Sequence, residues 1–262
     1  MSRFQSVQSF LKGAVPAAAF ACALAAAAPG HAADFFLQSA TMDTSRTAVI
    51  SGPGMNSNVY IGPLKFTAYE GTSAVGDSFE FLGFCVDIYH AIGLGTLNLK
   101  YDDNYDLETD SKYQGTTPFT PGATLLTDQQ VLQVGRLVNY GTLVFNQLPT
   151  GTLKTNKLAG LQGAIWQVIN PGYSVTSSNA AVNAFIANYS GANYNSVLTG
   201  HGHVNSNITF ITEKGKYGTK FAHQSFAIAA VPEPATWALM IGGFGLAGAA
   251  LRRRRGVIAA AA

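Results

Sequence analysis

Two side chains that lie far apart in this sequence have the types needed for an acyl-transfer reaction. Cys85 lies in a nearly continuous apolar run, 79–89, and Gln162 lies in a second apolar segment, 154–170. A thiolate is a strong nucleophile when a lowered pKa or a nearby base activates it. Attack of the Cys85 sulfur on the Gln162 carboxamide would expel ammonia and leave an activated acyl group, which a lysine amine could open.

The same two residues also have a simpler interpretation. A free cysteine is among the most buried residue types and usually packs as a small hydrophobe, and a glutamine on a helix can hydrogen-bond a neighbouring backbone group. Cys85 is the only cysteine besides Cys22, which lies in a predicted signal peptide, so no intrachain disulfide is expected. Burial among aromatic residues would protect the thiol in an oxidising compartment; the candidates are Phe79, Phe81, Phe84 and Trp166.

The elements that must position this pair follow a β, helical, β order. Short β-favouring runs separated by Gly and Pro turns lie at 35–38, 48–50, 59–61, 65–69 and 79–89. Helices are predicted from a capping box at Thr127 to about Leu148, over 154–170 and over 178–190, before β character returns at 207–212 and 220–229. This order predicts a β-rich α+β fold, an antiparallel β-sandwich-like domain with a helical insertion at about 127–190.

Both ends of the 262-residue chain have the composition of targeting segments. Arg3 and Lys12 precede an apolar run and small residues, which predicts a signal peptide over 1–33 and an exported domain over 34–230. At the other end the uncharged segment 235–251 is close to the minimum of about 17 residues for a membrane-spanning helix. Arg252, Arg253, Arg254 and Arg255 follow it, which predicts a single transmembrane helix with the arginines on the cytoplasmic side.

The C-terminal residues resemble a known sorting signal. Pro232, Glu233 and Pro234, a Trp three residues later, a Gly-rich apolar helix and the arginine run over 231–255 resemble the PEP-CTERM signal of Gram-negative bacteria. The resemblance implies that exosortase, a membrane protease-transpeptidase, recognises the Pro-Glu-Pro residues and removes the helix. It also implies export through the inner membrane, transient or permanent anchoring there, and a final place at the cell surface or outside the cell. The chain departs from the usual pattern from Gly256 onward, because more residues follow the arginines.

A second resemblance covers the Cys85 and Gln162 segments. Phe84-Cys85-Val86-Asp87 and Leu161-Gln162-Gly163-Ala164-Ile165-Trp166 together resemble the thioester domain of bacterial surface adhesins, which carries a Thr-Gln-x-Ala motif. The resemblance implies that Cys85 and Gln162 join as an intramolecular thioester, with Asp87, Ala164, Ile165 and Trp166 as motif neighbours. It also implies a β-sandwich with a helical subdomain. Leu161 departs from the pattern, because the family usually has Thr there.

Charge and motifs exclude several other function classes. Thirteen of the 14 acidic residues but only ten of the 16 basic residues lie within 34–230, so this part carries a net charge of about −3 and does not favour nucleic-acid binding. His201 and His203 favour a polar loop over a metal site, and the acidic stretch within 98–120 favours a solvated face over a calcium loop. No hydrolase or nucleotide-binding motif is present, and we expect no metal, no cofactor and no enzymatic activity.

These observations predict a surface or extracellular-matrix protein with a structural or adhesive role, in a biofilm for example, and with exosortase as a partner. Exopolysaccharide or amine-bearing surface molecules are further candidate partners. One alternative is a non-covalent exopolysaccharide-binding module that uses exposed aromatic residues such as Tyr101, Tyr105 and Tyr113. Another is a secreted enzyme with Cys85 as its nucleophile. Reactivity with amines separates them, because a thioester couples once, an enzyme turns over and a binding module does neither.

Overall fold

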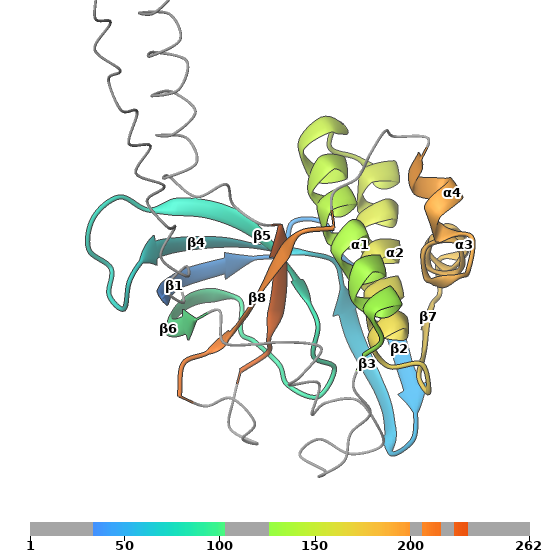
Figure 1. Ribbon diagram of the computed structural model, residues 1–262, viewed down its shortest axis with the longest axis horizontal. Coiled ribbons are helices and arrows are strands. Elements are labelled where there is room, and N and C mark those ends of the chain that lie inside the picture. The colour runs from blue at the N-terminus through green and yellow to red at the C-terminus, as the bar shows by residue number, and fades with distance from the viewer. Residues whose placement is uncertain (1–33, 103–125, 200–205, 216–222, 230–262) are drawn as a thin grey trace, which may run out of the picture. The chain divides into compact units, whose positions relative to one another are not determined.

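The computed structural model describes residues 34–102, 126–199, 206–215 and 223–229 (Figure 1). The predicted signal peptide, the predicted transmembrane helix and the residues Pro232, Glu233, Pro234 and Arg252–Arg255 lie outside these ranges. So do Tyr105, Tyr113, His201 and His203. Within the part that is described, no helix is long and apolar enough to cross a membrane.

Six antiparallel strands form a closed barrel in the order β1-β4-β5-β9-β8-β6. Their bounds are β1 Asp34–Thr41, β4 Leu64–Glu70, β5 Phe79–Cys85, β6 Gly95–Asp102, β8 Ile208–Glu213 and β9 Phe226–Ala229. The predicted β-sandwich-like arrangement is therefore wrong, although the α+β class with antiparallel strands is confirmed. The sheet closes because β1 pairs with β4 on one side and with β6 on the other. A bulge between Leu37 and Ser39 interrupts both pairings, and such bulges increase local twist and help a sheet to curve.

A separate three-stranded antiparallel sheet has the order β3-β2-β7. Its strands are β2 Arg46–Gly52, β3 Met55–Ile61 and β7 Ser174–Ser177. Pro53 and Gly54 form the turn between β2 and β3, and Gly54 has a φ of 73°, a conformation that glycine adopts without strain. Ala48, Ile50 and Val175 on one face of this sheet are buried, whereas the alternating residues of the other face are largely exposed.

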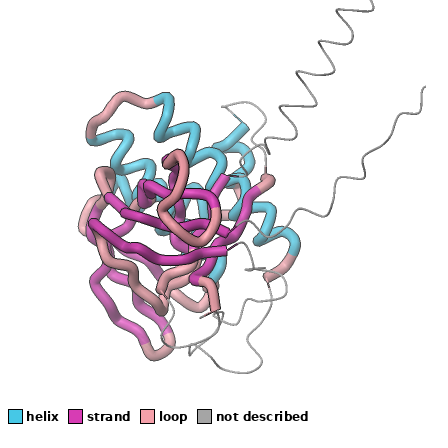
Figure 2. The backbone as a smooth tube through the Cα atoms, turned by 90° about the vertical axis from the view of Figure 1, so that its left-hand side faces the viewer, coloured by secondary structure: helices cyan, strands magenta, loops and turns pink. Residues whose placement is uncertain are grey.

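The helices gather to one side of the barrel strands (Figure 2). They are α1 Asp128–Gln147, α2 Thr152–Ile169, α3 Ala180–Ser190 and α4 Tyr194–Thr199. The predicted helical block and the capping box of Thr127 and Gln130 are confirmed. The block differs from the prediction in two ways, because β7 lies within it and α4 follows it. The predicted third helix begins later than expected, since Asn179 caps it through hydrogen bonds to the N–H groups of Ala181 and Val182.

Strand β5 joins the two parts of the hydrophobic core. Side chains alternate across a strand, so Leu82 and Phe84 pack with the residues of α1 and α2. Cys85 faces the other way, into a cluster that contains Phe66 and Phe226 of the barrel. The predicted burial of this strand on both faces is confirmed for its last four residues, Leu82 to Cys85. The two candidate site residues therefore lie where the helices meet the barrel.

Candidate functional site at the end of strand β5

Cys85 is the last residue of β5, and one of its two neighbouring ladders has already ended. The β4–β5 pairing stops at Leu64 and Gly83, whereas the pairing with β9 continues to Cys85 and Phe226. The Val86 N–H donates to the Ser225 carbonyl at 3.0 Å. In an antiparallel ladder this places the N–H and C=O of Cys85 on the side away from β9. These two backbone groups therefore point toward the β4 side of β5, at a position beyond the last residue of β4 that pairs with β5.

The side chain of Gln162, from α2, takes the place of the missing strand. The Cys85 N–H donates to Gln162 Oε1 at 2.9 Å, and Gln162 Nε2 donates to the Cys85 carbonyl at 2.8 Å. The two residues are 77 positions apart in the sequence. Gln162 is fully buried and Cys85 is 3% exposed. The carboxamide has the same donor and acceptor as a peptide group, so it extends the ladder by one residue.

The structure thus brings the predicted pair together, in a contact that agrees with the simpler interpretation of Gln162. Its amide bonds a neighbouring backbone, and that backbone belongs to Cys85 itself. A bond between the Cys85 sulfur and the Gln162 carbonyl carbon stays a prediction.

The environment of the Cys85 thiol disfavours its ionised form. Burial raises the pKa of Cys85 far above its ordinary value, and the negative charge of Asp87 raises it further. The nearby His90 does not face the thiol as a free base, because its Nδ1 pairs with Asp87 Oδ2. The thiol is therefore neutral and protonated at neutral pH.

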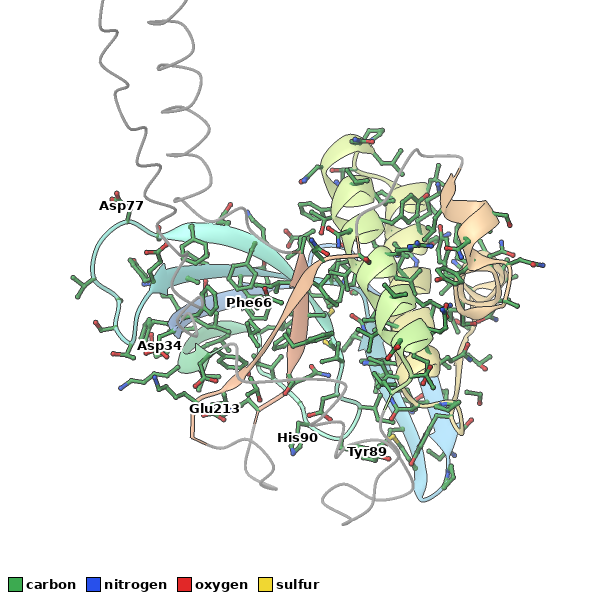
Figure 3. All side chains as sticks on the ribbon, in the orientation of Figure 1. Asp34, Phe66, Asp77, Tyr89, His90 and Glu213 are labelled. Carbon is green, nitrogen blue, oxygen red and sulfur yellow. The ribbon has the colours of Figure 1, made fainter. Side chains whose placement is uncertain are left out.

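Asp87 shapes the turn that follows β5. The sequence placed it within the strand, but β5 ends at Cys85, so this prediction is wrong. Asp87 Oδ1 accepts hydrogen bonds from the backbone N–H of Tyr89 at 2.8 Å and of His90 at 3.3 Å, and these two residues follow on the same turn (Figure 3). A buried carboxylate that bonds backbone N–H groups two and three residues later is a common turn device. The strand ends here because Asp87 turns the chain.

A buried polar network continues from this turn into the barrel. Gln224 Nε2 donates to the Asp87 carbonyl at 2.8 Å, and the hydroxyl of Tyr101 donates to the Gln224 carbonyl at 2.8 Å. Tyr101 is fully buried, so its predicted role as an exposed sugar-binding aromatic is wrong. Residues 98–102 and the buried Asp102 belong to β6, so the predicted acidic loop does not include them.

The motif neighbours on α2 are also buried. Ala164 and Ile165 pack in the cluster between the helices and the barrel, together with Leu161. Trp166 is 3% exposed, and among the described residues no acceptor is present for its indole N–H. Because Trp166 lies four residues after Gln162, the two share one helix face. An unpaired donor therefore lies one helical turn from the candidate acyl group.

One polar pair was missed by the sequence. His223 Nδ1 lies 2.8 Å from Glu213 Oε2 where β8 ends and the segment before β9 begins. The antiparallel pairing of β8 with β9 brings the adjoining ends of these strands together, and the two successive β runs at 207–212 and 220–229 are the sequence signal that could have indicated it. In the described ranges, no cluster of three or more His, Cys, Asp or Glu side chains is arranged to hold a metal ion.

Comparison with protein families concerns the C-terminal segment. Residues 230–255 match the PEP-CTERM protein-sorting motif. The match covers about a tenth of the chain and confirms the predicted PEP-CTERM sorting signal at the C-terminus. This PEP-CTERM motif implies processing by exosortase, export and localisation at the cell surface. Comparisons with curated proteins and with solved structures found no match, and none of the findings supports a thioester domain.

Proposed function

We propose that the protein is a structural or adhesive component of the cell surface or extracellular matrix of a Gram-negative bacterium, and not an enzyme. The sorting motif supports the destination. The contact between Cys85 and Gln162 supports a mode of attachment, in which an internal thioester couples the barrel domain to an amine on a neighbouring molecule.

The chemistry balances without an oxidant or a cofactor. The Cys85 sulfur bonds to the Gln162 carbonyl carbon, the carbon–nitrogen bond of the carboxamide breaks, and the thiol proton leaves with the nitrogen as ammonia. An amine on a partner then attacks the same carbon. The new amide bond forms, the carbon–sulfur bond breaks and the thiol regains a proton.

The hydrogen bond from the Cys85 N–H to Gln162 Oε1 is the observation that carries this proposal. At 2.9 Å the donor is placed to stabilise negative charge that develops on that oxygen when the sulfur adds to the carbon. The unpaired indole N–H of Trp166 is a candidate second donor. Since the raised pKa keeps the thiol protonated, proton transfer to the leaving nitrogen has to accompany attack. Burial of both groups excludes water, which would hydrolyse the product.

The two alternatives have weaker support. A cysteine nucleophile that turns over needs a thiolate at neutral pH, whereas the raised pKa of Cys85 keeps its thiol protonated. A sugar-binding module that relies on Tyr101 conflicts with the complete burial of that ring.

Intact mass tests the thioester directly. We expect the exported protein to weigh one ammonia less than its sequence, after peptide mapping has fixed its two ends. The Cys85→Ala variant should show no such deficit after allowance for the substitution. Incubation with a labelled small amine should add one amine per chain, at the peptide that contains Gln162.

A mass equal to the sequence, with one thiol that reacts under denaturant, would rule the thioester out. The surface destination has its own test, which is the fraction of the protein found outside the inner membrane in cells with and without exosortase. Substitution of Pro232, Glu233 and Pro234 by alanine should retain the protein in the membrane.

A further inference from the structure

The outer edge of β3 lacks the features that usually prevent edge strands from pairing. β3 lies at the end of the β3-β2-β7 sheet, and among the described residues no strand pairs with its other side. Its sequence, Met-Asn-Ser-Asn-Val-Tyr-Ile, has no charge and no proline, and its register with β2 is unbroken from Gly52–Met55 to Arg46–Ile61. Proteins usually blunt an exposed edge with charges, prolines, bulges or shortness. β3 has seven residues and none of these devices.

Hairpin geometry shows which backbone groups face outward. The turn of two residues makes Gly52 and Met55 a hydrogen-bonded pair, and bonded and non-bonded pairs then alternate along the ladder. The N–H and C=O groups of Asn56, Asn58 and Tyr60 therefore point away from β2. An independent contact agrees with this alternation of bonded and non-bonded pairs. Thr47 lies opposite Tyr60, and the Thr47 carbonyl accepts a hydrogen bond from Ser177 Oγ of β7 at 2.8 Å. The Thr47 carbonyl therefore points away from β3, as expected for a non-bonded pair.

The side chains of the same three residues are also exposed. Asn56 and Asn58 are open to solvent, and Tyr60 is 66% exposed. On the same face the neighbouring strand presents Val49, another exposed apolar side chain, opposite Asn58. Within the described ranges, this edge therefore offers backbone groups that no strand pairs with, neutral amide side chains and an exposed ring.

We propose that two copies of this chain associate through antiparallel pairing of their β3 strands. A two-fold axis at Asn58 places this residue opposite the partner's Asn58, and Asn56 opposite the partner's Tyr60. The outward N–H and C=O groups of Asn58 then form a reciprocal pair of hydrogen bonds. The two three-stranded sheets become one continuous sheet.

A second copy fits this edge for two reasons. When an uncharged strand pairs with its own copy, no like charges are brought together. A partner strand with charged residues would instead place those charges opposite the neutral amides of β3. The sorting motif also delivers every copy of the chain to the same surface, which raises their local concentration. The interaction does not require the Cys85–Gln162 thioester.

Asn58→Pro is the sharpest variant, because it removes an N–H that does not bond β2. Sedimentation of the full exported chain in detergent, over a range of concentrations, should give twice the chain mass for the wild type. The variant should have a dissociation constant about tenfold higher or more, because the dimer loses two hydrogen bonds. Thr176→Lys is the matched control, since it lies on the same face at β7 and should leave dimerisation unchanged.

Hydrogen exchange gives a readout that needs no variant. The amides of Asn56, Asn58 and Tyr60 should exchange more slowly as the wild-type concentration rises. A wild type at single-chain mass throughout would overturn the proposal. So would fast exchange of these amides at the highest concentration, or a folded Asn58→Pro variant that dimerises as well as the wild type. If the Asn58→Pro variant unfolds, Asn58→Lys is tested in its place. This change puts two positive charges opposite each other at the two-fold axis and should weaken the dimer.

Discussion

A glutamine at position 162 is tolerated in a buried helix because its side chain acts as a piece of β-strand. A buried polar group without partners destabilises the folded state, but both ends of this carboxamide are bonded to Cys85. The resemblance to the thioester domain implied that the two residues meet. It could not predict which atoms meet, because that depends on β4 starting at Leu64 and leaving Cys85 without a strand neighbour on the side away from β9.

Replacement of Gln162 by alanine should therefore destabilise the fold strongly. It leaves the buried N–H and C=O of Cys85 unsatisfied, at about 1–3 kcal/mol each, and adds a cavity. We expect the free energy of unfolding in urea to fall by about 3 kcal/mol or more. Gln133→Ala is the control, because the half-buried Gln133 side chain makes, among the described residues, one hydrogen bond, which its Nε2 donates to the Tyr189 carbonyl. Equal losses for the two variants would contradict the ladder role of Gln162.

Single residues around the site were predicted less well than the pair itself. An apolar run does not reveal where a strand ends, so Asp87 was placed in β5 although its carboxylate ends the strand. Tyr101 was interpreted as one of several exposed aromatic residues that could bind exopolysaccharide. Its burial follows from the closure of the barrel, which places β6 between β1 and β8.

The helices were predictable because their signals are local. The capping box at Thr127 lies at the helix end that it determines, and Pro171 and Gly172, which do not continue a helix, follow within three residues of the end of α2 at Ile169. Barrel closure depends instead on contacts between distant segments. The β6–β8 pairing that completes the ring consists of Tyr101 with Glu213 and Asp102 with Thr212. Two residue pairs thus distinguish the closed barrel from an open, sandwich-like arrangement, and no local pattern indicates them.

Close packing of α2 against α3 depends on Gly160. A Cβ at this position would lie 2.3 Å from the Cβ of Phe185, an atom that cannot move without its backbone. We expect Gly160→Ala to lower the free energy of unfolding by about 1–3 kcal/mol through overpacking, measured by denaturant titration. Gly172→Ala is the control, since nothing lies within 4 Å of the added Cβ. A stable Gly160→Ala variant would show that α3 can shift away from α2.

Several buried hydroxyl and thiol groups should make the whole domain sensitive to alkali. Burial raises the pKa of Tyr101, Tyr189 and Tyr89 above the ordinary value of tyrosine, and it raises the pKa of Cys85 as well. A neighbouring group adds to the rise for each tyrosine: Glu213 for Tyr101, Tyr140 for Tyr189 and Tyr173 for Tyr89. The unfolded chain releases the Cys85 proton above a pH of about 8.5 and the tyrosine protons above about 10, while the folded chain retains them. The free energy of unfolding should therefore be fully present below a pH of about 8.5 and decrease as pH rises.

Ultraviolet absorbance of tyrosinate, recorded together with circular dichroism, tests this expectation. The absorbance of the buried tyrosines should appear in one step with the loss of structure. In denaturant, all tyrosines should titrate near their ordinary value. If every tyrosine titrates smoothly near its ordinary pKa while the protein keeps its circular dichroism signal, the expected sensitivity to alkali is contradicted.

The last described strand leads directly into the sorting segment. β9 ends at Ala229, and the sorting motif begins at residue 230, so no spacer separates them. Mechanical load applied through this segment therefore reaches β9 first. β9 lies between β5 and β8, so a pull along it shears two ladders at once, while β5 is fastened to α2 at Cys85. A tension that enters at one strand is thus shared between the barrel wall and the helical layer.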